Sequence, residues 1–193
     1  MRIVKYPHPV LFHESKPLRR VDAGLKKMIR QMLELMYFDN GIGLAANQVD
    51  LPYRMFVMNP TGDPAEKDQE LVFINPVIAK RNGSEEGEEG CLSLPGIYAP
   101  VRRSARIVIS GYNLAGEQVR YELTGLPARA AQHEYDHLDG VLFVDRLDET
   151  ERLSVRKELD ELRREFEDER SHGRIPGDEQ IADQIKQLEL QRT

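Results

Sequence analysis

The chain contains a single cysteine, has no long apolar run and carries no excess of positive charge. One cysteine excludes an intrachain disulfide. No apolar run approaches the roughly 20 residues that a membrane-spanning helix needs, and residues 1–7 lack the apolar stretch of a signal peptide. A net charge of -6 argues against a protein whose main role is to bind nucleic acid, because the phosphates of nucleic acid attract positive charge. We therefore expect no membrane association and no direct DNA binding, and a cytoplasmic location, with an organelle matrix as the alternative.

The composition is that of an ordinary globular protein, with 40% hydrophobic and 31% charged residues over 193 positions. That length favours one domain with a single core and an appendage. Glu, Arg and Asp become dense beyond Glu149. We place a domain at residues 1–148 and a charged, helical C-terminal extension at residues 149–193.

The hydrophobic periodicity predicts a fold of the α+β class. Apolar residues at helical spacing indicate a helix over 22–39, with Asp22 as its N-cap, and a second helix is expected from Pro127 to about Gly140. Short strand-like runs occupy residues 54–58, 71–78, 106–113 and 117–123. The last two flank a hairpin turn at 113–116. The glycine-bearing segments 41–48 and 82–90 match neither a helix nor an ordinary strand.

The most specific chemical signal is the segment His133-Glu134-Tyr135-Asp136-His137. Residues four apart share one face of a helix, so the two imidazoles can bind one metal ion, with Glu134 placed to touch a metal-bound water. A chance match to this pattern has odds on the order of 1% for a chain of this composition.

A hydrolytic metal ion needs a third protein ligand and an open position for water. In one large protease class the third ligand is a histidine, in the pattern H-E-x-x-H-x-x-G-x-x-H. Phe143 occupies that last position in this chain. A second protease class uses a glutamate downstream of the histidines as the third ligand, and Glu158 and Glu161 are available for that role. Both, however, lie in a segment of paired charges that is typical of a solvated helix face. Cys91 is the remaining candidate, because a thiolate is a good ligand for a borderline metal.

Three motifs make the chain resemble the peptide deformylases. That family is recognised by G-x-G-L-A-A-x-Q, E-G-C-L-S and Q-H-E-x-D-H-L-x-G. The chain has all three without a mismatch, at residues 41–48, 89–93 and 132–140. The likeness covers about residues 1–148, and it implies short antiparallel sheets wrapped around a central metal-bearing helix.

The resemblance also implies a role for each motif residue. Cys91, His133 and His137 would hold the metal ion, and water would fill the fourth position. Glu134 would take a proton from that water and deliver it to the leaving amine. The Gln48 side chain and the backbone N–H of Leu92 would stabilise the oxyanion that forms at the formyl carbon.

The same resemblance places the substrate. Ile42, Gly43 and Gly90 would border the bound peptide, because glycines leave room for an added strand. Leu126 and Ala130 would wall the methionine pocket, although both are core residues on any interpretation. Arg129 is out of place beside an apolar pocket, and it either faces solvent or pairs with an acidic neighbour. His8, His13 and His172 are interpreted as surface histidines.

The predicted function is metal-dependent hydrolysis of the N-terminal formyl group of N-formylmethionyl nascent polypeptides, which releases formate. Two imidazoles and a thiolate are ligands soft enough to suit Zn²⁺. The resemblance instead implies Fe²⁺ as the ion in the cell, with Zn²⁺, Ni²⁺ or Co²⁺ possible in purified protein. One alternative is a zinc endopeptidase of the HExxH type, against which Cys91 as a ligand would argue. Another alternative is a non-catalytic binding module that a metal ion stabilises. Glu134, which would bind no metal there, argues against it, and so does the lack of a second cysteine, because a structural zinc site normally has a fourth protein ligand.

The extension at residues 149–193 lies outside the shared motifs. Its nine Lys and Arg stand against thirteen Asp and Glu. We expect an amphipathic helix packed on the domain through Leu153, Leu159, Leu162 and Phe166, followed by a short polar tail. Transient docking to the ribosome is the functional alternative, but the net negative charge disfavours attraction to RNA phosphates.

Overall fold

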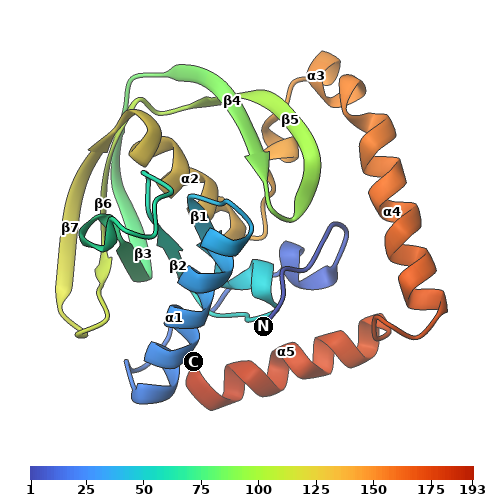
Figure 1. The fold of residues 1–193 in the computed structure, drawn as a ribbon, viewed down its shortest axis with the longest axis horizontal. Helices are drawn as coiled ribbons and strands as arrows, with labels where there is room; N and C mark the ends of the chain where they lie inside the picture. Colours follow the sequence, from blue (N-terminus) through green and yellow to red (C-terminus); the bar gives the residue numbers. More distant parts are fainter.

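A computed structural model describes all residues, 1–193, and confirms the α+β class. The strands form a five-stranded antiparallel sheet in the order β1-β2-β3-β6-β7 and a separate two-stranded sheet, β4-β5 (Figure 1). None of the helices combines the length and the hydrophobicity that crossing a membrane requires. The strands are β1 (Gly43–Ala45), β2 (Met55–Met58), β3 (Leu71–Asn82), β4 (Glu85–Cys91), β5 (Leu94–Arg103), β6 (Arg106–Tyr112) and β7 (Gln118–Thr124). The α-helices are α1 (Ala23–Phe38), α2 (Gly125–Leu138), α3 (Glu149–Ser154), α4 (Arg156–Ser171) and α5 (Asp178–Arg192).

Helix α2 is the central helix of the fold. Its alanines at 128, 130 and 131 are buried in one cluster with Phe56, Phe73 and Ile107 of the large sheet. Small side chains let the helix axis approach the sheet closely, as the sequence predicted. The helix begins at Gly125, two residues before the predicted start at Pro127. Its opposite side faces the β4-β5 hairpin, so the predicted metal-binding residues lie between two sheets.

Helix α1 confirms the predicted helix at residues 22–39. The Asp22 carboxylate accepts a hydrogen bond of 2.8 Å from the Leu25 N–H, which satisfies one of the free donors in the first turn. Leu25, Ile29 and Met32 are fully buried on one face. The helix ends at Phe38, and the following loop leads directly into β1.

The four predicted strands are present as β2, β3, β6 and β7, and the 113–116 turn closes with a 3.0 Å bond from the Gly116 N–H to the Asn113 carbonyl. Three further strands were not predicted. Strand β4 contains four Glu and two Gly in seven residues, a composition that disfavours strands. It forms because β5 pairs with it along its whole length. Strand β1 is only three residues long and fully buried, so no alternation of polar and apolar residues reveals it.

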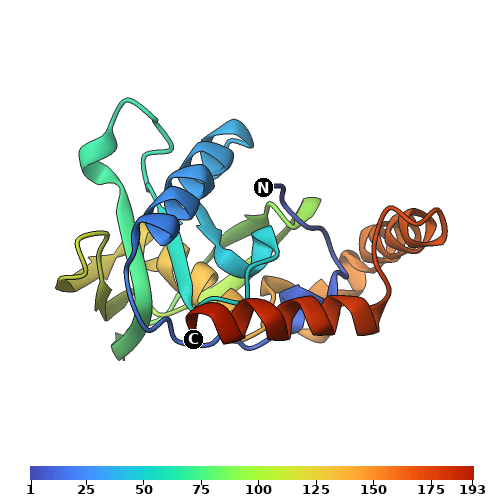
Figure 2. The same ribbon diagram turned by 90° about the horizontal axis from the view of Figure 1, so that it is seen from below.

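The C-terminal residues form three helices that wrap one side of the fold, with α4 running beside it and α5 returning beneath it to α1 (Figures 1 and 2). Leu162 and Phe166 are buried and Leu159 is partly buried, as predicted. The prediction for Leu153 is wrong, since it is 59% exposed. The helix breaks at Val155, between α3 and α4, so Leu153 and Leu159 do not belong to one continuous helix face. Residues 178–192 are not a plain polar tail, because α5 buries Ile181 and Ile185.

Candidate metal centre

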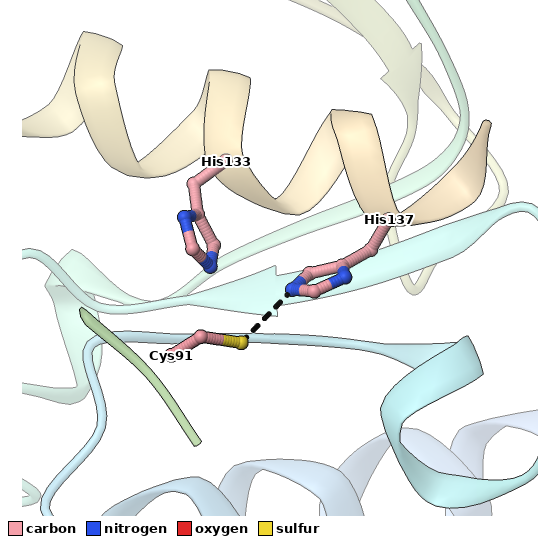
Figure 3. Close-up of side chains that lie close together, drawn as sticks. All are labelled: Cys91, His133 and His137. Atoms are coloured by element: carbon pink, nitrogen blue, oxygen red, sulfur yellow. Dashed lines mark hydrogen bonds between the residues drawn. The ribbon is translucent and has the colours of Figure 1, made fainter. Parts of the chain in front are cut away.

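Two histidines of α2 and the single cysteine converge on one point. His133 and His137 project from adjacent turns, and their ring centroids lie 5.0 Å apart. Cys91 reaches them from the end of β4, with its Sγ atom 3.3 Å from Nε2 of His137 (Figure 3). One ligand atom of each of the three residues lies within 4.8 Å of the others. No other group of three or more such side chains in the chain meets this distance.

The hairpin positions Cys91 by a break in its register. Gly90 pairs with Tyr98, but the next residue, Cys91, pairs with Leu94, so the ladder shifts between them. Irregularities of this kind re-aim a side chain at the end of a strand. Cys91 thereby points at α2 and remains partly accessible. Glu158 and Glu161, the alternative third ligands, are exposed on α4 and lie outside this group.

The donor set fits a single divalent ion. An ion bound at about 2.0–2.3 Å from each donor holds tetrahedral N and S ligands about 3.5 Å apart, close to the separation of Cys91 Sγ and His137 Nε2. Burial lowers the pKa of His137 well below its ordinary value, which favours the neutral imidazole that a metal requires. Glu89 Oε2 lies 3.0 Å from Nδ1 of His133, which leaves Nε2 of that ring free for the ion.

A buried ionic network supports this arrangement. Arg103 donates two hydrogen bonds of 2.8 Å to the Glu89 carboxylate and another to Asp136, one residue before His137. Arg146 bonds the same Asp136. Burial alone raises the pKa of Glu89, but the hydrogen bonds from Arg103 and His133 outweigh it and keep that pKa well below its ordinary value. Glu89 therefore stays ionised and can hold His133 in one orientation.

Glu134 lies beside the side chains of Cys91, His133 and His137 in a buried position. It is 4% exposed, and its Oε2 atom has no hydrogen-bond partner. Burial raises the pKa of this carboxyl to about 7, against the opposing effect of His133. Gly43 makes this placement possible, because a Cβ atom there would lie 2.4 Å from Glu134 Oε1. The absent side chain at Gly43 therefore accommodates the carboxylate, a reason that the sequence did not suggest.

Gln48 presents its amide N–H groups to the same point. The Ala45 N–H donates a 2.8 Å bond to Oε1 of Gln48, which fixes the amide orientation. Nε2 then faces the centre and lies 3.3 Å from Cys91 Sγ. Gln48 is 1% exposed, so this geometry is held by packing as well as by hydrogen bonds. Leu92 follows Cys91 at the border of the cavity next to the centre.

That cavity has a volume of about 830 Å³ and reaches the ligand group at Cys91 and His133. All of the predicted substrate-contacting residues border it: Ile42, Gly43, Gly90, Leu126 and Ala130. Ala130 is buried as expected. Leu126 is 51% exposed, so the expectation that it belongs to the core is wrong. It lies in the first turn of α2, where the side chain faces the cavity mouth instead of the sheet.

Arg129 pairs with an acidic neighbour, one of the two predicted outcomes. Its Nη1 atom lies 2.8 Å from Glu89 Oε1 and 2.8 Å from the Val101 carbonyl. The guanidinium lies over Gly87, where a Cβ atom would be 2.9 Å from it. Arg129 thus fastens the β4-β5 hairpin to α2. Glu89 and Arg103 are the site residues that sequence reasoning missed, although Glu89 stands within the E-G-C-L-S motif.

The remaining histidines lie outside the centre. His172 is exposed, as predicted, and His13 is half-buried with its Nε2 atom 2.8 Å from Glu189. The surface assignment of His8 is wrong, since it is 5% exposed. Its ring packs edge-on against Phe166 of α4. That contact joins residues far apart in the sequence, so no local pattern could reveal it.

The family described as Polypeptide deformylase matches residues 1–153. A peptide deformylase of Rhodopirellula baltica is 42% identical over 193 residues, which span 100% of this chain and 96% of the relative. The chloroplastic/mitochondrial peptide deformylase 1B of Arabidopsis thaliana is 43% identical over 87% of this chain and 62% of its own length.

Solved structures of peptide deformylases also resemble this chain. A crystal structure of Arabidopsis thaliana peptide deformylase 1B in complex with an inhibitor superimposes with a TM-score of 0.84 at 42% identity, covering 92% of this chain and 97% of that one. A Plasmodium falciparum peptide deformylase gives a TM-score of 0.83 at 38% identity, over 86% and 97% of the two chains. The likeness therefore includes both the sequence and the arrangement of the elements.

Proposed function

Because this chain belongs to the polypeptide deformylase family, we propose that its Cys91, His133 and His137 hold the metal ion with which it removes N-terminal formyl groups from nascent polypeptides. The reaction is hydrolysis of a formamide. The oxygen of water attacks the formyl carbon, the carbon–nitrogen bond breaks, and formate and a free amino terminus leave. The main support for the proposed ligand set is that these three side chains converge, with one ligand atom of each within 4.8 Å of the others.

When bound, a divalent ion supplies a Lewis acid, which polarises a carbonyl and makes water more acidic. The proton transfers are assigned to Glu134. It would accept a proton from the attacking water and then donate one to the leaving amine. The raised pKa of this buried carboxyl, about 7, suits a group that must both take and give a proton near neutral pH.

Gln48 and Leu92 are assigned to the oxyanion. Charge develops on the formyl oxygen as the carbon becomes tetrahedral, and preorganised N–H donors stabilise that charge. Nε2 of Gln48 is already oriented by the bond from Ala45. The backbone N–H of Leu92 is the second proposed donor, next to the ligand Cys91.

The apolar side of the cavity is the proposed methionine pocket, bounded by Leu126 and Ala130. Ile42, Gly43 and Gly90 would contact the peptide backbone. We expect formyl-Met and formyl-norleucine peptides to be turned over far better than formyl-Asp peptides, and each removed methylene to cost about 1 kcal/mol. Formate release measured for the three substrates tests this pocket, and equal rates would contradict it.

We propose Fe²⁺ as the ion in the cell, and Zn²⁺, Ni²⁺ or Co²⁺ as ions that replace it during purification. Ferrous iron binds more weakly than these three ions, so it is lost easily. Reconstitution of the apoprotein with each metal under anaerobic conditions, followed by formate assays and peroxide exposure, tests the assignment. The ferrous form should be faster than the zinc form and should be inactivated by peroxide. A zinc form of equal speed, together with a peroxide-resistant ferrous form, would contradict it.

The zinc endopeptidase alternative is not favoured, because a cysteine completes the ligand group and the relatives are deformylases. We propose residues 1–148 as the catalytic domain and residues 149–193 as an extension that packs on it. A cytoplasmic location stays a proposal, since one relative, of Arabidopsis thaliana, is named chloroplastic/mitochondrial. Transient contact with the ribosome stays a proposal, and the negative charge of the extension argues against binding through RNA phosphates.

A further inference from the structure

The proposed metal ligands come from two elements whose apolar residues lie in different hydrophobic clusters. His133 and His137 belong to α2, and the buried alanines of that helix pack in one cluster with the large sheet. Cys91 belongs to the β4-β5 hairpin, and the buried apolar residues of β5 pack in another cluster with residues 142–147 and α4. The contacts that hold Cys91 opposite the two histidines are therefore the polar ones between the hairpin and the helix.

Alternate residues of β4 lie against successive turns of α2. The facing pairs are Gly87 with Arg129 at 3.2 Å, Glu89 with His133 at 3.0 Å, and Cys91 with His137 at 3.3 Å. Four residues of helix advance about 6.0 Å, and two residues of strand advance about 6.7 Å, so the two repeats stay matched over this length. Strand β4 thus runs along α2 in the same direction, and the register between them determines which residue faces His137.

Arg129 bonds the hairpin one helical turn before His133. Besides the Gly87 carbonyl, it donates to the Glu85 carbonyl of β4 at 2.9 Å and to the Val101 carbonyl of β5 at 2.8 Å, so it contacts both strands. Its side chain is 14% exposed, and a Cβ atom at Gly87 would lie 2.9 Å from its Cζ atom. The guanidinium therefore lies directly against the backbone of β4.

The other links between α2 and β4 end on side chains. His133 meets the Glu89 carboxylate, and Arg103 of β5 joins that carboxylate to Asp136 of α2. A bond to a side chain still lets the strand move by rotation of that side chain, whereas a bond to a backbone carbonyl fixes the strand itself. Arg129 is the only side chain of α2 that donates to backbone carbonyls of β4. It is therefore the contact that best determines the register of the strand along the helix.

We propose that Arg129 is a positioning residue that sets the register of β4 along α2 and thereby holds Cys91 at metal-binding distance from His133 and His137. This inference rests on the proposed function, since it takes those three residues as the ligands. Arg129 acts through the hairpin and does not bind the ion. Its removal leaves the two histidines in place on α2 and loosens the strand that carries the cysteine, so the sulfur ligand should be lost first.

The test titrates the metal-free protein with Co²⁺ under anaerobic conditions, because a thiolate bound to Co²⁺ gives a charge-transfer absorption of its own. Arg129→Met keeps a side chain of similar length and removes its donors. We expect the dissociation constant for Co²⁺ to rise by about 10–100-fold, the usual effect of removing a group that orients a metal ligand. The thiolate absorption per bound Co²⁺ should also fall, which a general loss of stability would not cause.

Gly87→Ala is a second variant that retains Arg129. The added methyl group would displace the flexible guanidinium from β4, since a Cβ atom there lies 2.9 Å from Cζ of Arg129. Gly87→Ala should therefore show the same two changes, a weaker affinity for Co²⁺ and a lower thiolate absorption.

Arg54→Met is the matched control. The side chains of Arg54 and Arg129 are 15% and 14% exposed, but Arg54 bonds Asp139 at the end of α2 instead of the hairpin. This control should bind Co²⁺ as the wild type does. Wild-type affinity in Arg129→Met would overturn the proposal, and so would an equal loss in Arg54→Met; if Arg129→Met does not fold, Gly87→Ala decides. A wild type that binds Co²⁺ without thiolate absorption would contradict the proposed ligand set instead.

Discussion

The ionic network behind helix α2 and the ion pairs of helix α4 are built from the same residue types in opposite surroundings. Arg103 and Glu89 are 4% and 5% exposed and form two bonds of 2.8 Å. Arg156 and Asp160 are 72% and 49% exposed and lie 3.9 Å apart. Charge is denser along α4, yet the pairs that contact the proposed metal ligand His133 are the buried ones. Burial and hydrogen-bond partners therefore indicate function here, and charge density does not.

The largest effect should come from removing Arg103. Arg103→Met leaves Glu89 and Asp136 buried without their shared cation, which costs about 3–5 kcal/mol in the free energy of unfolding. Chemical denaturation measures this loss. Arg102→Met is the matched control on the same strand, because Arg102 and its partner Glu86 are 70% and 55% exposed. A loss of similar size in both variants would contradict the distinction between buried and exposed pairs.

Gln48→Leu should have the next largest effect, on catalysis instead of stability. Removing one oxyanion donor lowers kcat by about 10²–10³-fold, or about 3 kcal/mol of barrier. The measurement is formate release under saturating substrate, with metal content checked in the same sample. Gln184→Leu in the exposed face of α5 serves as the control and should leave kcat unchanged. A Gln48→Leu enzyme with normal kcat would remove Gln48 from the mechanism.

The contact between His8 and Phe166 should make stability depend on pH. Burial, with smaller effects of Arg2 and Arg170, lowers the pKa of His8 from 6.5 to about 4, whereas Asp178 opposes this shift. The unfolded chain therefore takes up a proton near pH 6.5 that the folded chain does not. Stability should fall as the pH drops from 6.5 toward 4, by about 2 kcal/mol at pH 5.

His8→Leu should lose that part of the pH dependence, whereas substitution of the exposed His172 by Leu should keep it. Urea denaturation of the three proteins at pH 7 and pH 5 gives the comparison. Parallel pH profiles for wild type and His8→Leu would show that His8 is protonated in the folded protein.

The smallest effect is expected on α4. Arg156→Ala removes an exposed i,i+4 pair, so the free energy of unfolding should change by less than about 0.5 kcal/mol. A loss above about 1.5 kcal/mol would mean that α4 depends on its surface charges as much as α2 depends on its buried ones.

Sequence reasoning predicted those parts of the structure that local patterns determine. The α+β class, helices α1 and α2, strands β2, β3, β6 and β7 and the Asp22 cap follow from periodicity and cap chemistry. The convergence of Cys91 with His133 was also predicted, although they lie 42 positions apart in the sequence, because the motif resemblance implied it.

The features that the sequence did not predict depend on packing between residues that are far apart in the chain. Strand β4 is stabilised by β5 and by Arg129 above Gly87, neither of which a seven-residue window shows. The buried ring of His8 packs against Phe166 of α4, a contact between residues far apart in the sequence. No sequence pattern distinguishes Arg103 from the other arginines, and its role depends on the fold, which places Glu89 and Asp136 on either side of it.

The central claim is that Cys91 binds the metal ion whereas Glu134 acts on protons without binding it. Metal content per chain, measured on anaerobically purified wild type, Glu134→Ala and Cys91→Ser, tests this most directly. The wild type and Glu134→Ala should each hold one ion, although Glu134→Ala loses nearly all formate release. Cys91→Ser should lose the ion, because a neutral hydroxyl is a much weaker ligand than a thiolate. Full metal content in Cys91→Ser, or loss of metal from Glu134→Ala, would contradict the account.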